Sequence, residues 1–298
     1  MNSMDCTSLQ VTHHNHINQR LYYCANVPLM QDCALYYNKA WYTILLILKI
    51  TLYTRILEFT MAKFLARPHR FTWQQTMLRI KDPLASVPFY EENFGMKLIH
   101  KYDFPEWKFS LYFMITPPAG VTLPEPGTKA AEDYLWSMDG VCLELTHNHG
   151  SESDDSFKVN NGNAEPHRGF GHIAMMTRDV YAACAKMETA GLKFQKKPDE
   201  GKMKGLAFVL DPDGYWVEII TRAPESLVQN EFTFAQTMLR IKDPVKTLRF
   251  YREILGMDLL AKRDFGVGTN WGFSLYFLAN LTDEQREGMP GKPCAMLL

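Results

Sequence analysis

The chain has 298 residues, of which 46% are hydrophobic and 22% are charged, and its formal net charge is −1. This length and composition are typical of a globular protein with one or two domains and a sizeable core. The balance of 32 basic and 33 acidic residues argues against a polyanionic partner such as nucleic acid. The six cysteines show no paired spacing, which favours reduced thiols in a cytoplasmic protein over a disulfide framework.

The first part of the chain, 1–70, differs from the remainder and is expected to be a poorly ordered N-terminal extension. Its apolar run 41–53 contains Lys49 and is shorter than the roughly 20 apolar residues that a membrane helix needs, so no membrane span is expected. An organellar transit peptide and an artefactual extension ahead of Met61 are the alternatives. The histidine-rich segment 12–16 is expected to be a solvated tail rather than a metal site.

A repeated sequence gives the clearest sign of domain organisation. QTMLRIKDP occurs at 75–83 and again, 161 residues further on, at 236–244. FSLYF occurs at 109–113 and at 273–277, so three residues have been inserted into the second copy. Identity over this length at one offset indicates tandem duplication of a whole domain rather than a short solenoid repeat.

The first copy opens with a predicted strand at 75–80, followed by a helix. Asp82 is placed to cap this helix and Pro83 suits its first turn, while Gly95 ends it. Runs of β-branched and aromatic residues predict three more strands, at 97–104, 109–115 and 141–146. The order of elements is βαβββ.

The same order then returns. A strand is predicted at 171–177, and the helix 180–190 follows, capped by Asp179 and stopped by Gly191. Asp-Pro-Asp-Gly at 211–214 is a strong turn signal. The remaining strands are predicted at 192–196, 205–210 and 216–221.

These patterns predict an α+β fold made of paired βαβββ modules. Two modules form a complete domain at 71–222. An incomplete second domain follows at 232–298, with part of its first module.

Each module of the complete domain ends on an apolar strand that carries one carboxylate, Glu144 in the first and Glu218 in the second. An ionised carboxylate inside a core has to be paired, protonated or bound to a metal. Strand side chains alternate between faces, so either one could point to solvent. Their equivalent positions in two modules favour a shared functional role.

Gln75 and His172 open the two modules at matching positions. A pseudo-twofold arrangement would bring Gln, Glu, His and Glu around one point, with one imidazole nitrogen and three oxygens. Such a set suits an octahedral divalent metal with water in the open positions; zinc is expected first, with nickel, cobalt or iron as alternatives. His172 alone would more often be a core histidine. Gln236 repeats Gln75 in the second copy.

Several segments resemble the glyoxalase I (lactoylglutathione lyase) family of the vicinal-oxygen-chelate superfamily: FTWQQTMLRIKDP, DFPEWKFSLYF, CLELTHN, RGFGHIAM and KKPDEGKMKGLAFVLDPDGYWVEI. The likeness is almost continuous over 71–222 and returns over 232–279. It implies the paired glyoxalase fold and a metal site built across two domains. In that site one domain supplies the Gln/Glu half and the other supplies the His/Glu half.

The resemblance also implies how substrate binds. Glutathione carries two carboxylates, which basic side chains can pair with. The substrate contacts that the resemblance implies are Arg79, Asn148, Arg168 and Lys196, with Lys202, Met203 and Lys204 in a loop that closes over the substrate. Gly201 and Gly205 bracket this loop as candidate hinges. Arg240 repeats Arg79 in the second copy.

The implied reaction converts the hemithioacetal of methylglyoxal and glutathione to S-lactoylglutathione through an enediolate. A divalent metal would stabilise the developing charge and a carboxylate would move the proton. Glu218 is the expected principal base, and Glu144 its counterpart for the other stereoisomer. The expected partner is this small molecule, with neither nucleic acid nor membrane.

The second copy departs from the family because no further CLELTHN, RGFGH or DPDGYWVEI follows 273–277. His172 and Glu218 should then meet Gln236 but lack a second glutamate, so a homodimer is expected to complete a site. Two alternatives stay open. Another metalloenzyme of this superfamily, such as an extradiol dioxygenase, would want two histidines and one carboxylate, which Gln75 disfavours. An inactive or regulatory truncated paralogue is disfavoured by the four intact ligands.

Overall fold

A computed structural model describes residues 71–224, 226, 228–266, 268–269 and 272–288. All of the described residues belong to one compact unit, 70–298. The predicted N-terminal extension, with its transit-peptide and histidine-rich segments, lies outside the described residues. Among the residues that are described, no helix has the length and apolar character needed to cross a membrane.

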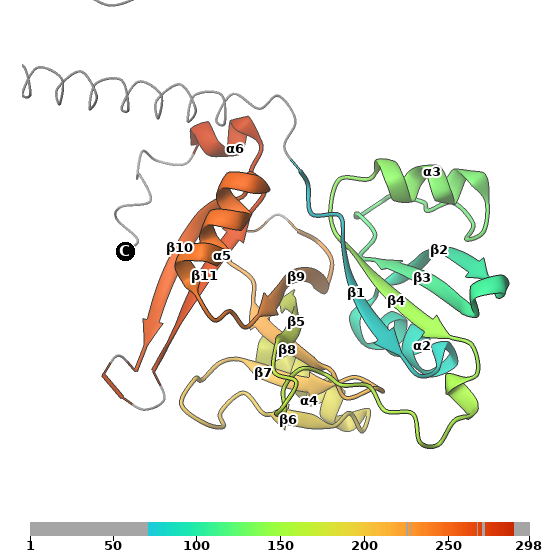
Figure 1. Ribbon diagram of the computed structural model, residues 1–298, viewed down its shortest axis with the longest axis horizontal. Helices are drawn as coiled ribbons and strands as arrows, with labels where there is room; N and C mark the ends of the chain where they lie inside the picture. The colour runs from blue at the N-terminus through green and yellow to red at the C-terminus, as the bar shows by residue number, and fades with distance from the viewer. Residues whose placement is uncertain (1–70, 225, 227, 267, 270–271, 289–298) are drawn as a thin grey trace, which may run out of the picture. The chain divides into compact units, whose positions relative to one another are not determined.

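The first module is a four-stranded sheet with the strand order β1-β4-β3-β2 (Figure 1). Its strands are β1 (Gln75–Ile80), β2 (Lys97–Phe104), β3 (Phe109–Ile115) and β4 (Cys142–Asn148). β1 runs parallel to β4, and the other neighbours are antiparallel. A short 3-10 turn, η1 (Pro105–Trp107), joins β2 to β3, and another, η2 (Ser151–Ser153), follows β4.

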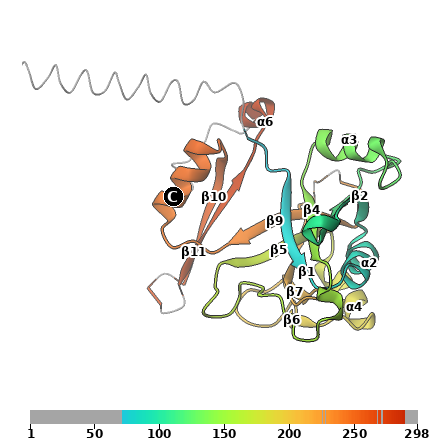
Figure 2. The same ribbon diagram turned by 45° about the vertical axis from the view of Figure 1, so that its right-hand side comes forward.

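Helix α2 (Pro83–Phe94) packs beside this sheet, as Figure 2 shows. Its two ends form as the sequence predicts. The Asp82 side chain accepts a hydrogen bond from the amide of Leu84, and Gly95 takes a left-handed conformation at φ 64°, which costs glycine little.

Helix α3 (Lys129–Ser137) was not predicted from the sequence. The hydroxyl of Thr128 caps it by accepting the amide hydrogen of Ala131 at 3.2 Å. Its buried residues are Ala131 and Leu135. Ala131 and Leu135 lie one helical turn apart, so this spacing and the Thr128 cap are the sequence signals that could have found the helix.

The second module shares one sheet with β9 (Phe232–Leu239), in the order β6-β7-β8-β5-β9. Its own elements are β5 (Phe170–Thr177), α4 (Val180–Thr189), β6 (Phe194–Lys196), β7 (Ala207–Leu210) and β8 (Trp216–Thr221). The predicted elements of both modules are present, with ends that differ by at most two residues. The predicted α+β class and βαβββ order are therefore confirmed.

The incomplete second domain holds a third module. This module repeats the order of the first module's elements but does not form a single sheet. After β9 come α5 (Pro244–Arg249), the π-helical turn η3 (Phe250–Ile254), β10 (Asp258–Phe265), β11 (Phe273–Ala279) and α6 (Asp283–Gly288). β10 and β11 form a separate two-stranded sheet, whereas β9 pairs antiparallel with β5. In the first module β4 joins β1 to β3, and the described residues contain no counterpart of β4 in the third.

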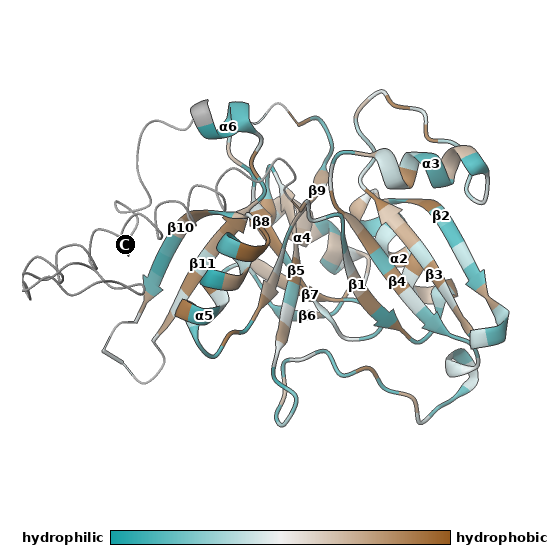
Figure 3. Cartoon of the chain, turned by 45° about the horizontal axis from the view of Figure 1, so that its top comes forward, coloured by the Kyte–Doolittle hydropathy of each residue, from teal (hydrophilic) through white to brown (hydrophobic). Residues whose placement is uncertain are grey.

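One apolar core joins the two complete modules. It contains Leu78 and Leu145 from the first module and Ile173 and Val217 from the second. Figure 3 shows brown, apolar stretches along the strands of both modules. Because the strands β1, β4, β5 and β8 enter this core, their few polar side chains are held at fixed positions.

The turn between β7 and β8 fastens the second module onto the first. Asp213 accepts hydrogen bonds from the amide of Lys81 at 3.0 Å and from the hydroxyl of Ser86 at 3.2 Å. The hydroxyl of the buried Tyr90 donates to Asp211 at 2.8 Å. The Asp-Pro-Asp-Gly signal thus marks a turn, as predicted, and that turn also covers the start of α2.

Candidate metal centre and substrate site

His172 and Glu218 meet on the parallel neighbours β5 and β8. Nε2 of His172 lies 3.2 Å from Oε2 of Glu218, and both side chains are almost buried. Nε2 makes no hydrogen bond in spite of this burial. The His172 ring also contacts Phe208 edge to face, with centroids 5.1 Å apart. A buried imidazole nitrogen without a hydrogen bond, beside a carboxylate, fits a pair of metal ligands.

Gln236 joins this pair from the third module. It lies opposite Ala174 in the antiparallel pairing of β9 with β5, and its Nε2 donates to Oε2 of Glu218 at 3.0 Å. Rotation of the terminal amide would present its oxygen, the metal-binding atom, instead. His172, Glu218 and Gln236, hereafter the ligand trio, offer one nitrogen and two oxygens. Three of the four expected ligands are therefore together within one chain.

A glycine allows β9 to approach β5 this closely. A Cβ atom on Gly171 would lie 2.6 Å from the sulfur of Met238 and 3.1 Å from its carbonyl oxygen. Gly171 directly precedes His172, so the close approach occurs next to the ligand trio. A side chain at this position would displace the end of the Met238 side chain and crowd the Met238 carbonyl of β9.

Gln75 and Glu144 form a separate pair on β1 and β4. The Gln75 amide donates to Oε2 of Glu144, and the hydroxyl of Thr146 donates to Oε1 at 2.8 Å. In the described part of the chain, no three His, Cys, Asp or Glu side chains gather into a metal-binding group. Glu144 therefore does not join His172 and Glu218, and the two halves belong to different sites.

The two copies of the repeated sequence meet at a single polar contact. The hydroxyl oxygens of Thr76 on β1 and Thr237 on β9 lie 2.7 Å apart. These threonines occupy equivalent positions in the two copies. The contact places β1 next to β9. The glutamines of these strands hydrogen-bond to different carboxylates, Gln75 to Glu144 and Gln236 to Glu218.

Arg168 and Arg240 lie beside the start of β5. Burial and the nearby charge of Arg168 lower the pKa of Arg240. Arg168 is exposed, with its Nε 3.5 Å from Oε1 of Glu165. Arg240 is bonded through its backbone amide to the carbonyl of Gly169 at 2.8 Å. Two cations next to the ligand trio suit an anionic substrate group.

Lys196, on β6, and Met203, in the loop after β6, are the other two contacts predicted for this half. Nζ of Lys196 donates to the carbonyl of Leu206 at 2.6 Å. Burial lowers the pKa of Lys196, and Lys204 adds to this effect, while the negative charge of Glu218 acts in the opposite direction. Met203 is half-buried in its loop. The predicted hinge glycines on either side both have left-handed φ angles.

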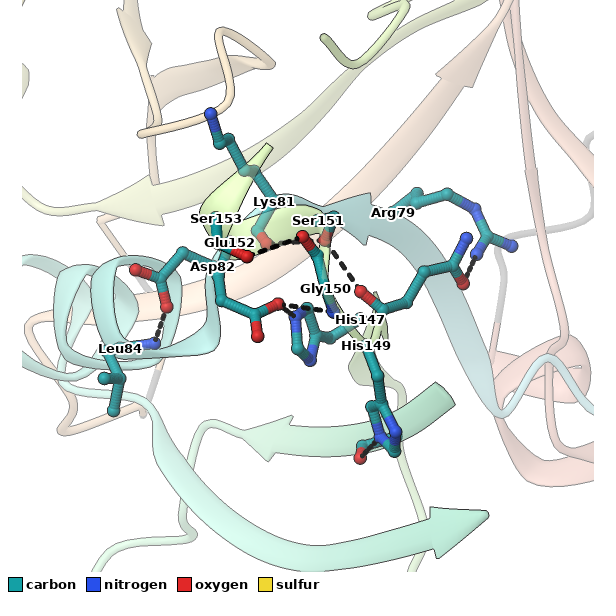
Figure 4. Close-up of polar contacts among 12 residues, drawn as sticks. Arg79, Lys81, Asp82, Leu84, His147, His149, Gly150, Ser151, Glu152 and Ser153 are labelled. Carbon is teal, nitrogen blue, oxygen red and sulfur yellow. Dashed lines mark hydrogen bonds and ion pairs between the residues drawn. The ribbon is translucent and has the colours of Figure 1, made fainter. Parts of the chain in front are cut away.

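Arg79 and Asn148 lie at the far end of the Gln75/Glu144 half. Nη1 of Arg79 donates to Oδ1 of Asn148 at 2.5 Å, at the corner drawn in Figure 4. The following turn is held by Ser151, whose hydroxyl donates to the carbonyl of Lys81 at 2.7 Å. His147 and Glu152 close the same turn with a 2.7 Å contact. Asn148 thus orients Arg79 here, a role that the sequence did not suggest.

Sequence reasoning missed three further residues of these sites: Thr146, Phe208 and Asn163. Thr146 and Phe208 contact predicted ligands from neighbouring strand positions. Asn163 bonds Arg240 at 2.8 Å. The asparagine-rich stretch 160–163 signals a turn, but a turn signal does not say which distant side chain the turn will face.

Comparisons with known proteins agree on one family. The model of the Glyoxalase/Bleomycin resistance protein/Dioxygenase superfamily matches residues 72–219 and 233–289. Glyoxalase I of Saccharomyces cerevisiae is 46% identical over 209 residues, which cover 68% of this chain and 61% of the yeast protein. Lactoylglutathione lyase of Pseudomonas putida is 47% identical over 160 residues, which cover 52% of this chain and 87% of that protein.

A solved structure has a similar fold. The crystal structure of glyoxalase I from Zea mays is 29% identical, with a TM-score of 0.53, and the match covers 72% of this chain and 64% of the maize chain. The chain thus spans about three fifths of the length of the yeast and maize relatives.

Proposed function

The chain belongs to the glyoxalase I (lactoylglutathione lyase) family, and from this premise we propose that it converts the hemithioacetal of methylglyoxal and glutathione to S-lactoylglutathione. The observation that carries the proposal is the ligand trio, a His-Glu-Gln set within one sheet of the chain. The amide ligand disfavours a dioxygenase, which would want a second histidine. We place the activity in the cytoplasm, where glutathione and the buried thiols of Cys142 and Cys184 stay reduced.

The ligand trio fits a divalent metal, for which we propose zinc first, with nickel, cobalt and iron as alternatives. Nε2 of His172 would bind it with the side-chain oxygens of Glu218 and Gln236, which leaves positions for water and substrate. The bound metal would supply positive charge that stabilises an enediolate. Glu144 and Gln75 would supply the equivalent oxygens of the other half-site.

We assign proton transfer to Glu218, with Glu144 as its counterpart in the other half-site. The Glu218 carboxylate would take the proton from the carbon that carries sulfur and return it to the neighbouring carbonyl carbon. The hydroxyl proton passes to the other oxygen, so substrate and product contain the same atoms. The carboxylate lies almost buried in an apolar strand, which excludes water from the reacting carbons.

We assign three cations to binding the carboxylates of glutathione at the ligand trio: Arg168, Lys196 and Arg240. They are remote from the reacting carbons and would contribute to substrate affinity more than to the chemical step. At the other half-site Arg79 and Asn148 would take the same role. We assign Met203 and its glycine-flanked loop to covering the bound substrate.

We infer that the ligand trio functions within one chain, with water or a substrate oxygen in place of a second glutamate. The homodimer expected from the sequence stays an alternative. In it the Gln75/Glu144 half of one chain would meet the His172/Glu218 half of another. Since β9 already occupies the edge of β5, that arrangement requires β9 to leave this edge.

The test is lactoylglutathione formation by the purified full chain at several protein concentrations, with and without a chelator. We expect activity that a chelator removes and a divalent metal restores. If no metal gives activity, the inactive or regulatory paralogue is the better assignment.

Mixing two variants separates the one-chain site from the homodimer. For a one-chain site, Glu218→Ala loses activity, Glu144→Ala keeps most of it, and the mixture shows their sum. For the homodimer both variants are impaired alone, and mixing restores part of the activity, because one of the two sites in a mixed dimer carries neither defect.

A further inference from the structure

The loop that precedes β5 folds around the guanidinium of Arg240. Its sequence is Asn-Asn-Gly-Asn at 160–163. Oδ1 of Asn160 accepts the amide hydrogen of Gly162 at 3.0 Å, and Oδ1 of Asn161 accepts that of Asn163 at 3.0 Å. These bonds are typical of asparagine turns. The loop therefore has a defined shape before any substrate binds.

Arg240 is held by this loop in one orientation. Its Nη1 donates to the carbonyls of Gly162 at 3.2 Å and Phe170 at 2.9 Å. Its Nη2 donates to Oδ1 of Asn163 at 2.8 Å. A guanidinium has five N–H donors, so the Nε–H and one Nη2–H remain. Two donors on one guanidinium are what a carboxylate binds in a bidentate contact.

Gly162 is required for this arrangement. It has a left-handed φ of 73°, and a Cβ atom there would lie 2.5 Å from the carbonyl oxygen of Phe170. The carbonyls of Gly162 and Phe170 both accept hydrogen bonds from Arg240. The close approach of Gly162 to Phe170 therefore brings these two acceptors together. A side chain at Gly162 would separate them.

Asn163 links this arginine to the metal-binding strand. Its Nδ2 donates to the carbonyl of Gly171 at 2.8 Å, and Gly171 directly precedes His172. One side chain therefore fixes both the guanidinium plane of Arg240 and the backbone next to the ligand trio. An anionic group held by Arg240 would be aligned with the metal through a single residue.

We propose that Asn163 is the positioning residue that holds the free edge of Arg240 toward a carboxylate of a glutathione conjugate. The assignment rests on the proposed function and adds a residue that neither the repeat nor the family resemblance singled out. Arg79, the counterpart of Arg240, has a matching asparagine contact from Asn148. Each half-site thus orients its arginine with an amide from a different place in the chain.

The experiment is calorimetric titration of the metal-loaded full chain with S-hexylglutathione, an unreactive conjugate, and with its carboxyl-esterified form. We expect wild type to bind the free acid and to bind the ester far more weakly. Asn163→Ala should weaken binding of the free acid by about tenfold, the loss of one hydrogen bond to a charged group. Binding of the ester, and the metal content, should stay unchanged.

A double-variant cycle tests whether Asn163 acts through Arg240. In an Arg240→Ala background, Asn163→Ala should have little further effect. Asn163→Asp keeps the oxygen that faces Arg240 but adds a competing negative charge, so it should also weaken binding of the free acid. Asn93→Ala, on α2, is the control, because its amide contacts the carbonyl of Phe89 in its own helix.

The outcomes separate two failures. If wild type binds neither conjugate and forms no lactoylglutathione, the proposed function is wrong. If wild type binds the free acid and Asn163→Ala and Asn163→Asp bind it equally well, the positioning role is wrong and the function stands. Equal loss of metal and conjugate in Asn163→Ala would show a structural role and also overturn the proposal.

Discussion

The sequence QTMLRIKDP folds twice in this chain, at 75–83 and at 236–244, into the same local structure in two different environments. Leu78 is 2% exposed, whereas the same leucine in the second copy, Leu239, is 48% exposed. The isoleucines of the two copies differ in the same direction, with Ile80 at 0% and Ile241 at 40%. Identical residues thus give the same order of strand and helix, with different ends, but not an identical core.

The difference shows which properties are local. In both copies an aspartate caps the helix, Asp82 in the first and Asp243 in the second, with its side chain accepting a backbone amide hydrogen. Capping needs only neighbouring residues. Burial needs a partner surface, which β4 and the 211–215 turn supply to the first copy. Within the described residues, the second copy has no equivalent of β4.

The largest expected effect concerns the site that the second copy joins. His172→Ala removes the nitrogen of the ligand trio, so metal affinity should fall by more than the roughly 10- to 100-fold typical of an outer-shell partner. Metal content after dialysis measures this. His149→Ala is the control, since His149 contacts Ser110 and Asp103 instead. Full metal occupancy in His172→Ala would show that His172 is not a metal ligand.

The two glutamines of the repeat give a matched test. Gln236 contacts Glu218, and Gln75 contacts Glu144. For a one-chain site at the ligand trio, Gln236→Ala should lower kcat/KM by about tenfold or more, because it removes one of three metal ligands. Gln75→Ala should have the smaller effect. A larger loss in Gln75→Ala would show that the Gln75/Glu144 half carries the activity.

Sequence patterns predicted the fold well because its signals are local and repeated. Caps at Asp82 and Asp179 and the turn at 211–214 set the elements of both complete modules. Two side-chain roles depended on distant contacts. The Asn148 and Asn163 amides were not predicted to orient arginines, because their partners lie on other segments. Helix α3 was also missed, although the Thr128 cap and the one-turn spacing of Ala131 and Leu135 are local signals.

The placement of β9, which brings Gln236 to His172 and Glu218, was expected from the family resemblance and not from local signals. The repeated sequence predicts a strand in both copies. Which sheet the second strand, β9, joins depends on the free edge of β5. The glycine next to His172 leaves room for β9, and a single glycine in a strand gives no sign of which segment will approach it.

The two leucines of the repeat test how far the environments differ in energy. Leu78→Ala should lower the free energy of unfolding by about 2–5 kcal/mol, because it leaves a cavity in the core that joins the two modules. Leu239→Ala should lower it by less than about 1 kcal/mol, because a half-exposed side chain loses little on truncation. Urea unfolding of the full chain measures both. Equal losses would show that the second copy is covered in solution by a surface outside the described residues.

The last expected effect on stability concerns pH and the turn that covers the first copy. Burial raises the pKa of Asp211 to about 7, against an ordinary value of 3.8, although the hydroxyl of Tyr90 and the backbone amide of Tyr215 donate to its carboxylate. Between these two pKa values the folded state holds a proton that the unfolded state has lost. The contribution of Asp211 to stability is therefore complete below pH about 4 and is lost as the pH rises through about 7.

Asp211→Asn should flatten this dependence, because an amide stays neutral at every pH while keeping an oxygen for these hydrogen bonds. Relative to this variant, the wild type should lose roughly 2–3 kcal/mol of unfolding free energy between about pH 5 and pH 8. Urea unfolding at the two pH values measures it, with Asp155→Asn as the exposed control. If wild type and Asp211→Asn change in parallel, Asp211 is ionised throughout, and the turn covers the first copy as strongly at pH 8 as at pH 5.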